Sequence, residues 1–135
     1  MPSRHHHWPT RWLGRAVAAV AVCATAGCAQ YGPQVPTYVV FFTPDSTSLD
    51  APANSVIADA ATAAATVPGR KVYVAGYADA RGTPQALHDL TLRRTQAVAA
   101  GLAAQGVASS RIVLEPKGHE GGDIGIESRR VEIEF

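Results

Sequence analysis

An aspartate and an arginine stand where the sequence pattern otherwise predicts apolar residues. Asp79 follows a run of β-forming residues, 72–77, that predicts a buried strand. Arg94 lies on a helix predicted to begin at Pro84, about 20° around the helix axis from the apolar Leu87. The arginine therefore falls inside the apolar stripe of its helix. A buried arginine keeps its charge, so it needs an anionic partner or an anionic ligand.

Two interpretations of this pair are open. Asp79 and Arg94 could form a structural ion pair that ties the helix to the strand on which it packs. Alternatively, they could line a cleft that binds a zwitterion. The ammonium of such a ligand would then contact Asp79, and its carboxylate would contact the planar guanidinium of Arg94.

The residues around the pair resemble the motif of a known family. D-A-R-G at 79–82, followed by D-L-T-L-R-R at 89–94, resembles the D-x-x-G … L-S-x-x-R-[RA] motif of OmpA-like peptidoglycan-binding domains. The interval of fifteen residues from Asp79 to Arg94 is that of the family. The run R-R-V-E-I at 129–133 is similar to the last strand of these domains, so that the resemblance covers residues 38–135.

The resemblance implies how the chain would bind its ligand. In the family, the aspartate and the second arginine hold diaminopimelate of the peptidoglycan stem peptide, and these roles fall on Asp79 and Arg94. Thr91 stands where the family motif has serine. The loop 43–46 corresponds to one beside the peptide pocket, so Asp45 is a candidate secondary contact, although a turn-forming role explains this residue better.

Three positions depart from the family pattern. Ala78 replaces a threonine, Leu87 replaces an asparagine, and Ser128 replaces a second asparagine. Each hydrogen bond lost with these groups would weaken binding by roughly 1 kcal/mol. Two functions therefore remain open. The first is non-covalent binding of peptidoglycan; the second is a decayed pocket on a domain that binds a neighbouring envelope protein.

An enzyme is not expected. Asp79 with His88 could be drawn as an acid–base pair, but no serine stands in a nucleophile-elbow context and no phosphate-binding loop is present. His119, Glu120 and Asp123 match no metal-ligand spacing, so neither a metal nor a cofactor is expected. From Cys28 onward, nine Lys and Arg face eleven Asp and Glu, and this balance does not favour nucleic-acid binding.

The first 27 residues are typical of an export signal, with three arginines followed by a short apolar run. T-A-G-C at 25–28 resembles a bacterial lipobox, which implies lipidation of Cys28 and an anchor in the outer membrane, facing the periplasm. Residues 28–36 would then be a lipidated N-terminus and a Pro-rich tether. The alternative is ordinary cleavage after A-T-A at 24–26, leaving a soluble periplasmic protein.

The remaining residues, 37–135, predict one α+β domain with the order β-α-β-α-β-β, in which two helices pack on one face of a mixed sheet. The pattern predicts strands at 38–42, 72–77, 111–114 and 131–135, helices at 51–66 and from 84 to about 104, and a Gly-rich loop at 117–127.

Overall fold

The computed structural model describes residues 36–79, 81–119 and 125–135. The predicted signal peptide, Cys28 and nearly all of the predicted tether lie outside the described residues, as do Glu120 and Asp123.

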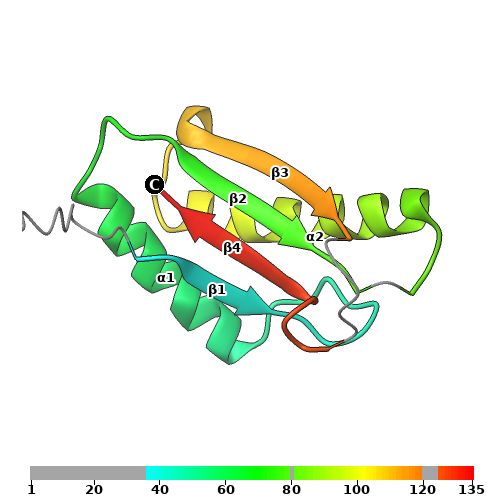
Figure 1. Cartoon of the computed structure of the whole chain (residues 1–135). Coiled ribbons are helices and arrows are strands. Elements are labelled where there is room, and N and C mark those ends of the chain that lie inside the picture. Colours follow the sequence, from blue (N-terminus) through cyan, green and yellow to red (C-terminus); the bar gives the residue numbers. More distant parts are fainter. Residues whose placement is uncertain (1–35, 80, 120–124) are drawn as a thin grey trace, which may run out of the picture. The chain divides into compact units, whose positions relative to one another are not determined.

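Four strands of the described chain form one mixed sheet in the order β1-β4-β2-β3 (Figure 1). β4 (Arg130–Glu134) lies between β1 (Tyr38–Phe41) and β2 (Val72–Tyr77) and is antiparallel to both. β3 (Ile112–Gly118) is parallel to β2 and forms one edge of the sheet. β1, β2 and β3 therefore run in the same direction. Their carboxyl ends lie at the same end of the sheet as the start of β4.

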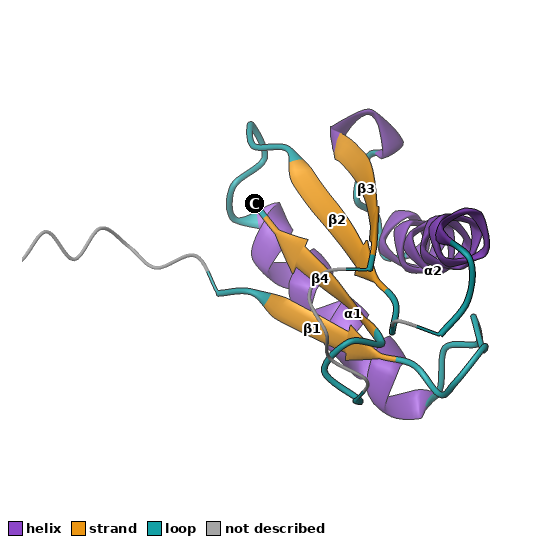
Figure 2. Ribbon diagram, turned by 45° about the vertical axis from the view of Figure 1, so that its right-hand side comes forward, coloured by secondary structure: helices purple, strands orange, loops and turns teal. Residues whose placement is uncertain are grey.

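Two helices, α1 (Ala51–Ala65) and α2 (Pro84–Ala104), pack on the same face of this sheet (Figure 2). The opposite face is not covered by a helix of the described residues. The predicted α+β architecture is confirmed. The main core side chains are Val40, Val74, Val131 and Ile133 from the sheet, with Ile57, Ala60, Val98 and Leu102 from the helices.

Local sequence signals explain where both helices begin. The side chain of Asp50 accepts a hydrogen bond from the Ala53 backbone N–H at 2.8 Å, and Thr83 does the same for Ala86 at 3.2 Å. These bonds satisfy N–H groups that have no partner within the first turn of a helix. Asp50 therefore caps α1, and Thr83 caps α2.

A glycine lets α2 approach the sheet closely. A Cβ atom at Gly76 of β2 would lie 2.7 Å from Cγ2 of Thr95 and 3.0 Å from the backbone oxygen of Thr91. Only a residue without a side chain fits at this contact. The close approach fixes the helical turn on which Arg94 stands directly against the end of β2.

The third strand is longer than the sequence predicts. The prediction ended it at Leu114 and began a loop at Lys117, whereas the pairing with β2 continues to Gly118. A proline, Pro116, lies within this strand and disfavoured its extension on sequence grounds. β3 pairs on one side only, and a proline is tolerated on such an edge strand.

Arg111, predicted to start the third strand, instead belongs to a short 3₁₀ turn, Ser109–Arg111. Its guanidinium donates hydrogen bonds to the backbone oxygens of Ala64 at 3.1 Å, Val67 at 2.9 Å and Arg70 at 2.8 Å. Ala64 lies in the last turn of α1, whereas Val67 and Arg70 follow the helix. Arg111 therefore caps α1 from a distant part of the chain.

Candidate functional site

Arg94 is fully buried, as its place in the apolar stripe predicts, with an exposed fraction of 0%. Its Nε donates a hydrogen bond to the Ser46 backbone oxygen at 2.9 Å, and its Nη2 donates to that of Thr43 at 3.1 Å. Nη1 donates to the backbone oxygen of Tyr77 at 3.4 Å, and the guanidinium lies 5.0 Å from the ring centroid of Phe42. The arginine thus joins the loop after β1 to the end of β2.

The charges around Arg94 do not fully balance it. Burial lowers the pKa of Arg94, and the positive charge of Arg129 lowers it further, whereas the carboxylates of Asp45 and Asp79 raise it. A lowered pKa means that folding disfavours the charged form of this base, although an arginine stays protonated in the neutral range. The site therefore holds a buried cation that a further anion would stabilise.

Asp79 lies in the loop that follows β2 and does not pair with Arg94. Its Oδ2 is 3.4 Å from Nη2 of Arg81 and 3.6 Å from Nη1 of Arg129. Its Oδ1 also accepts a hydrogen bond from the Arg81 backbone N–H at 3.3 Å. The structural ion pair between Asp79 and Arg94, one of the two interpretations above, is therefore wrong: each residue has other partners.

Arg129 is a residue of this region that the sequence analysis did not select. It precedes β4, and its Nε donates a hydrogen bond to the Phe42 backbone oxygen at 3.4 Å. Its side chain is 16% exposed and pairs with Asp79. The alternation of β4 carried the signal: Val131 faces the core and Arg130 faces outward, so the residue before them points inward.

The other predicted site residues differ in their exposure and in their partners. Asp45 is exposed in the loop after β1, and its φ of 55° is typical of a turn residue. Thr91 is fully buried and its hydroxyl donates a hydrogen bond to the backbone oxygen of His88, in its own helix. Ala78 and Leu87 are both buried, and neither side chain supplies a polar group.

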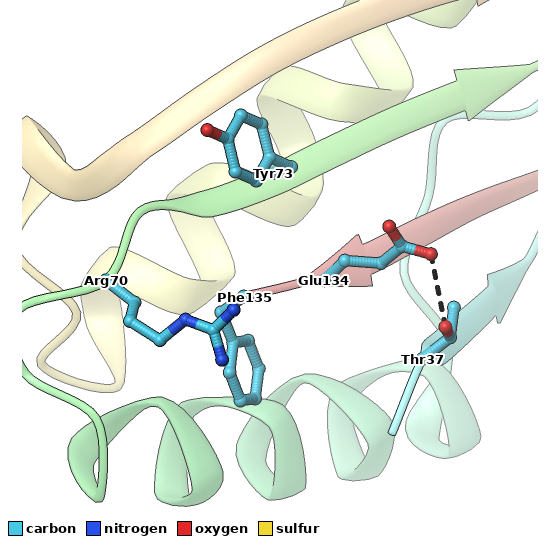
Figure 3. A pocket seen from close by; sticks show the side chains of 5 residues that line it. All are labelled: Thr37, Arg70, Tyr73, Glu134 and Phe135. Atoms are coloured by element: carbon cyan, nitrogen blue, oxygen red, sulfur yellow. Dashed lines mark hydrogen bonds between the residues drawn. The ribbon is translucent and has the colours of Figure 1, made fainter. Parts of the chain in front are cut away.

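Two of the cavities among the described residues lie at opposite ends of the strands. One, of about 430 Å³, lies at the end of the sheet where Asp79 follows β2. It is lined in part by Gly82, Leu87 and His88. The other, of about 320 Å³, is shown in Figure 3. Arg70 and Phe135 both line this cavity, and the hydroxyl of Thr37 donates a hydrogen bond to Glu134. No predicted site residue lines this second cavity.

The described residues offer no evidence for a metal centre or a membrane span. No group of three or more His, Cys, Asp or Glu side chains among them could hold a metal ion. Neither of the two helices described above has both the length and the apolar character needed to cross a membrane.

Comparison with solved structures identifies the fold as that of OmpA-like domains. The OmpA-like domain of FopA1 from Francisella tularensis is 24% identical, with a TM-score of 0.64, over 73% of this chain and 70% of that one. The peptidoglycan-associated lipoprotein of Burkholderia pseudomallei is also 24% identical, with a TM-score of 0.64, over 72% and 88%. The periplasmic domain of Helicobacter pylori MotB is 20% identical, with a TM-score of 0.60, over 71% and 69%.

A model of the OmpA family matches residues 41–125, which is more than half of the chain. The chain therefore belongs to the OmpA family, as the motif at 79–94 predicts. No curated protein sequence matches it.

Proposed function

We propose that this domain binds the stem peptide of peptidoglycan without catalysis, with Asp79 and Arg94 as its two anchor residues. The observation that carries the proposal is the fully buried cation Arg94, which lies at the same end of the sheet as Asp79. Membership of the OmpA family supports it, as does the likeness to a protein named peptidoglycan-associated lipoprotein. Diaminopimelate, with an ammonium and a carboxylate on one carbon, matches these two charges.

Binding to Arg94 requires the loop after β1 to move. The three hydrogen bonds of Arg94 use three of its five N–H donors, and its side chain is closed off from solvent. Displacement of Ser46 and Thr43 would exchange neutral carbonyl acceptors for a charged carboxylate, and hydrogen bonds to a charged acceptor are roughly twice as strong. The loop 43–46 then acts as a cover that the ligand displaces.

Asp79 is the more accessible anchor residue. Its partner Arg81 has a side chain that is 68% exposed, and an ion pair so exposed contributes little. A ligand ammonium can therefore replace Arg81 at low cost. Arg129 remains behind Asp79 and holds the carboxylate in position.

The envelope location belongs to the same proposal. Lipid on Cys28 would attach the protein to the outer membrane, and the Pro-rich tether would connect this lipid to the domain. β1 begins at the end of the sheet opposite to the end where β2 stops (Figure 1), and Asp79 follows β2 by two residues. The start of β1, which the tether would precede, and the proposed peptide site therefore lie at opposite ends of the sheet, which suits a link between membrane and wall.

A second candidate function rests on the closed state of Arg94. An arginine with no exposed surface, in a domain where the buried Ala78 and Leu87 supply no polar group, also fits a decayed pocket on a domain that binds an envelope protein. A folded wild-type domain that fails to sediment with purified peptidoglycan would favour this second function.

The test is sedimentation of the domain with purified peptidoglycan containing diaminopimelate. We expect the wild type to sediment, and Asp79→Asn to lose at least about tenfold in affinity because the ligand ammonium loses its charged partner. Asp59→Asn, an exposed aspartate of α1, is the control for net charge and should sediment like the wild type. Sedimentation of Asp79→Asn at the wild-type level would contradict the assignment.

Arg94 needs a conservative change because it also supports the fold. Arg94→Lys keeps the positive charge but removes the planar fork that contacts a carboxylate through two hydrogen bonds. We expect weaker sedimentation for this variant while its circular dichroism spectrum matches that of the wild type.

A further inference from the structure

The larger cavity lies between the first turns of α2 and the end of β3. Gly82, Pro84 and Leu87 form an apolar wall, and Gly118 lies opposite them. Three nitrogen-bearing side chains complete the lining: His88, Lys117 and His119. None of the described residues that line the cavity is acidic. Its polar groups therefore suit an acceptor of hydrogen bonds, and an anion above all.

Asp79 and this cavity share one loop. The backbone N–H of Ala78, next to Asp79, donates a hydrogen bond to the Gly118 oxygen at 2.8 Å. The strand order β1-β4-β2-β3 sets Arg94 and the loop 43–46 toward β1, whereas the cavity lies toward β3. A ligand held at Asp79 can therefore extend across the loop that follows β2 and into the cavity.

The apolar wall of the cavity follows from two features of this sequence. Gly82 has a φ of 134°, which side chains rarely adopt, and a Cβ there would lie 3.4 Å from Cδ2 of Leu87. Leu87, only 6% exposed, packs beneath this glycine where the family has asparagine. Polar recognition in this part of the site falls to His88 and His119, both of which are exposed.

We propose that this cavity binds a second carboxylate of the stem peptide, outside the diaminopimelate centre held by the two anchor residues. This inference rests on the proposed function and names a specificity-determining subsite for it. The imidazoles of His88 and His119 donate hydrogen bonds to the carboxylate, and the apolar wall packs against the adjoining hydrocarbon. Lys117 adds positive charge, which its ion pair with Glu115 at 2.8 Å reduces.

Two carboxylates of a stem peptide have this chemistry: the α-carboxylate of its D-glutamyl residue and the carboxylate of its terminal D-alanine. Three synthetic peptides distinguish them by isothermal titration calorimetry. One carries both carboxylates, the second has the D-glutamyl α-carboxylate amidated, and the third has the terminal carboxylate amidated. We expect the wild type to lose about tenfold in affinity for one of the amidated peptides, which is the usual range for a hydrogen bond to a charged group.

The variant His88→Ala/His119→Ala tests whether the cavity is responsible. Both residues are exposed, so the fold should be unaffected, and we expect the preference for the free carboxylate to fall below about twofold. Gln96→Ala, another exposed residue of α2, is the matched control and should keep the wild-type preference.

The possible results separate this inference from the proposed function. Equal affinity of the wild type for all three peptides, or an unchanged preference in the double histidine variant, would overturn the subsite. The anchor residues would still stand if Asp79→Asn abolished binding. If the wild type bound none of the peptides, the proposed function would fail and this inference with it.

Discussion

Arg94 combines a structural and a candidate binding role in one side chain. Its three hydrogen bonds go to backbone oxygens on two segments, which makes it part of the fold. Its burial and the neighbouring Arg129 nevertheless disfavour its charge, so an added anion would be bound with a gain in stability. The same charge holds the closed loop through these hydrogen bonds and, in the proposed function, would attract the carboxylate of the ligand.

Removal of the guanidinium should destabilise the domain. Arg94→Met keeps most of the volume but leaves the carbonyl groups of Thr43, Ser46 and Tyr77 without their donor. We expect a loss of about 2–4 kcal/mol in the free energy of unfolding, measured by urea denaturation. Arg93→Met, on the exposed side of the same helix, should change it by less than about 0.5 kcal/mol. Equal stability of the two variants would contradict the structural role.

Periodicity predicted which residues are buried but not which polar atoms meet. The 3.6-residue pattern correctly turned Arg94 toward the core. It could not show that backbone oxygens, and not Asp79, are its acceptors, because the loop 43–46 is distant in sequence and has no periodic pattern. Arg129 was missed for a related reason: its contacts with Asp79 and Phe42 exist only once β4 lies between β1 and β2.

The same distinction holds for whole elements. Helix starts were predictable, since Asp50 caps α1 through atoms three residues away. The ends that depend on partners distant in sequence were not. β3 extends beyond its prediction because β2 continues to pair with it as far as Gly118. Arg111 leaves the predicted strand, and its guanidinium binds carbonyl groups in the last turn of α1 and directly after it.

The contact between β2 and α2 depends on the absence of a side chain at Gly76. We expect Gly76→Ala to lower the free energy of unfolding by about 1–3 kcal/mol, since the new methyl group would overlap Thr95 and the backbone of Thr91. Gly69→Ala is the control: a Cβ there meets no atom within 4 Å, so stability should be unchanged or slightly higher. Thermal or urea unfolding of both variants measures the difference.

The distant cap on α1 gives a second test at this scale. Arg111→Leu removes three hydrogen bonds to backbone oxygens, and we expect a loss of about 2–3 kcal/mol in urea denaturation. Arg111→Lys retains the charge near the carboxyl end of the helix, where a cation is favourable, and should fall between the wild type and the leucine variant. A leucine variant as stable as the wild type would show that solvent satisfies these carbonyl groups equally well.

At the scale of the whole molecule, the strand direction sets how far the proposed site lies from the membrane. The eight residues 29–36 span at most roughly 30 Å when extended. β2 has six residues, so about 20 Å separates the end of the sheet where β1 begins from the end where Asp79 lies. A lipid on Cys28 would therefore keep the proposed peptide site within about 50 Å of the membrane surface.

Cys28→Ala separates the two attachments that this arrangement proposes. We expect the variant to leave the membrane fraction, because no acyl chain remains on residue 28, and still to sediment with purified peptidoglycan through Asp79 and Arg94. Cys23→Ala, a change within the predicted signal peptide, should stay in the membrane fraction. Mass spectrometry of the mature N-terminus gives the direct measurement. An unmodified start before Cys28 would favour the soluble periplasmic form, whereas joint loss of both attachments would contradict the proposal that they are independent.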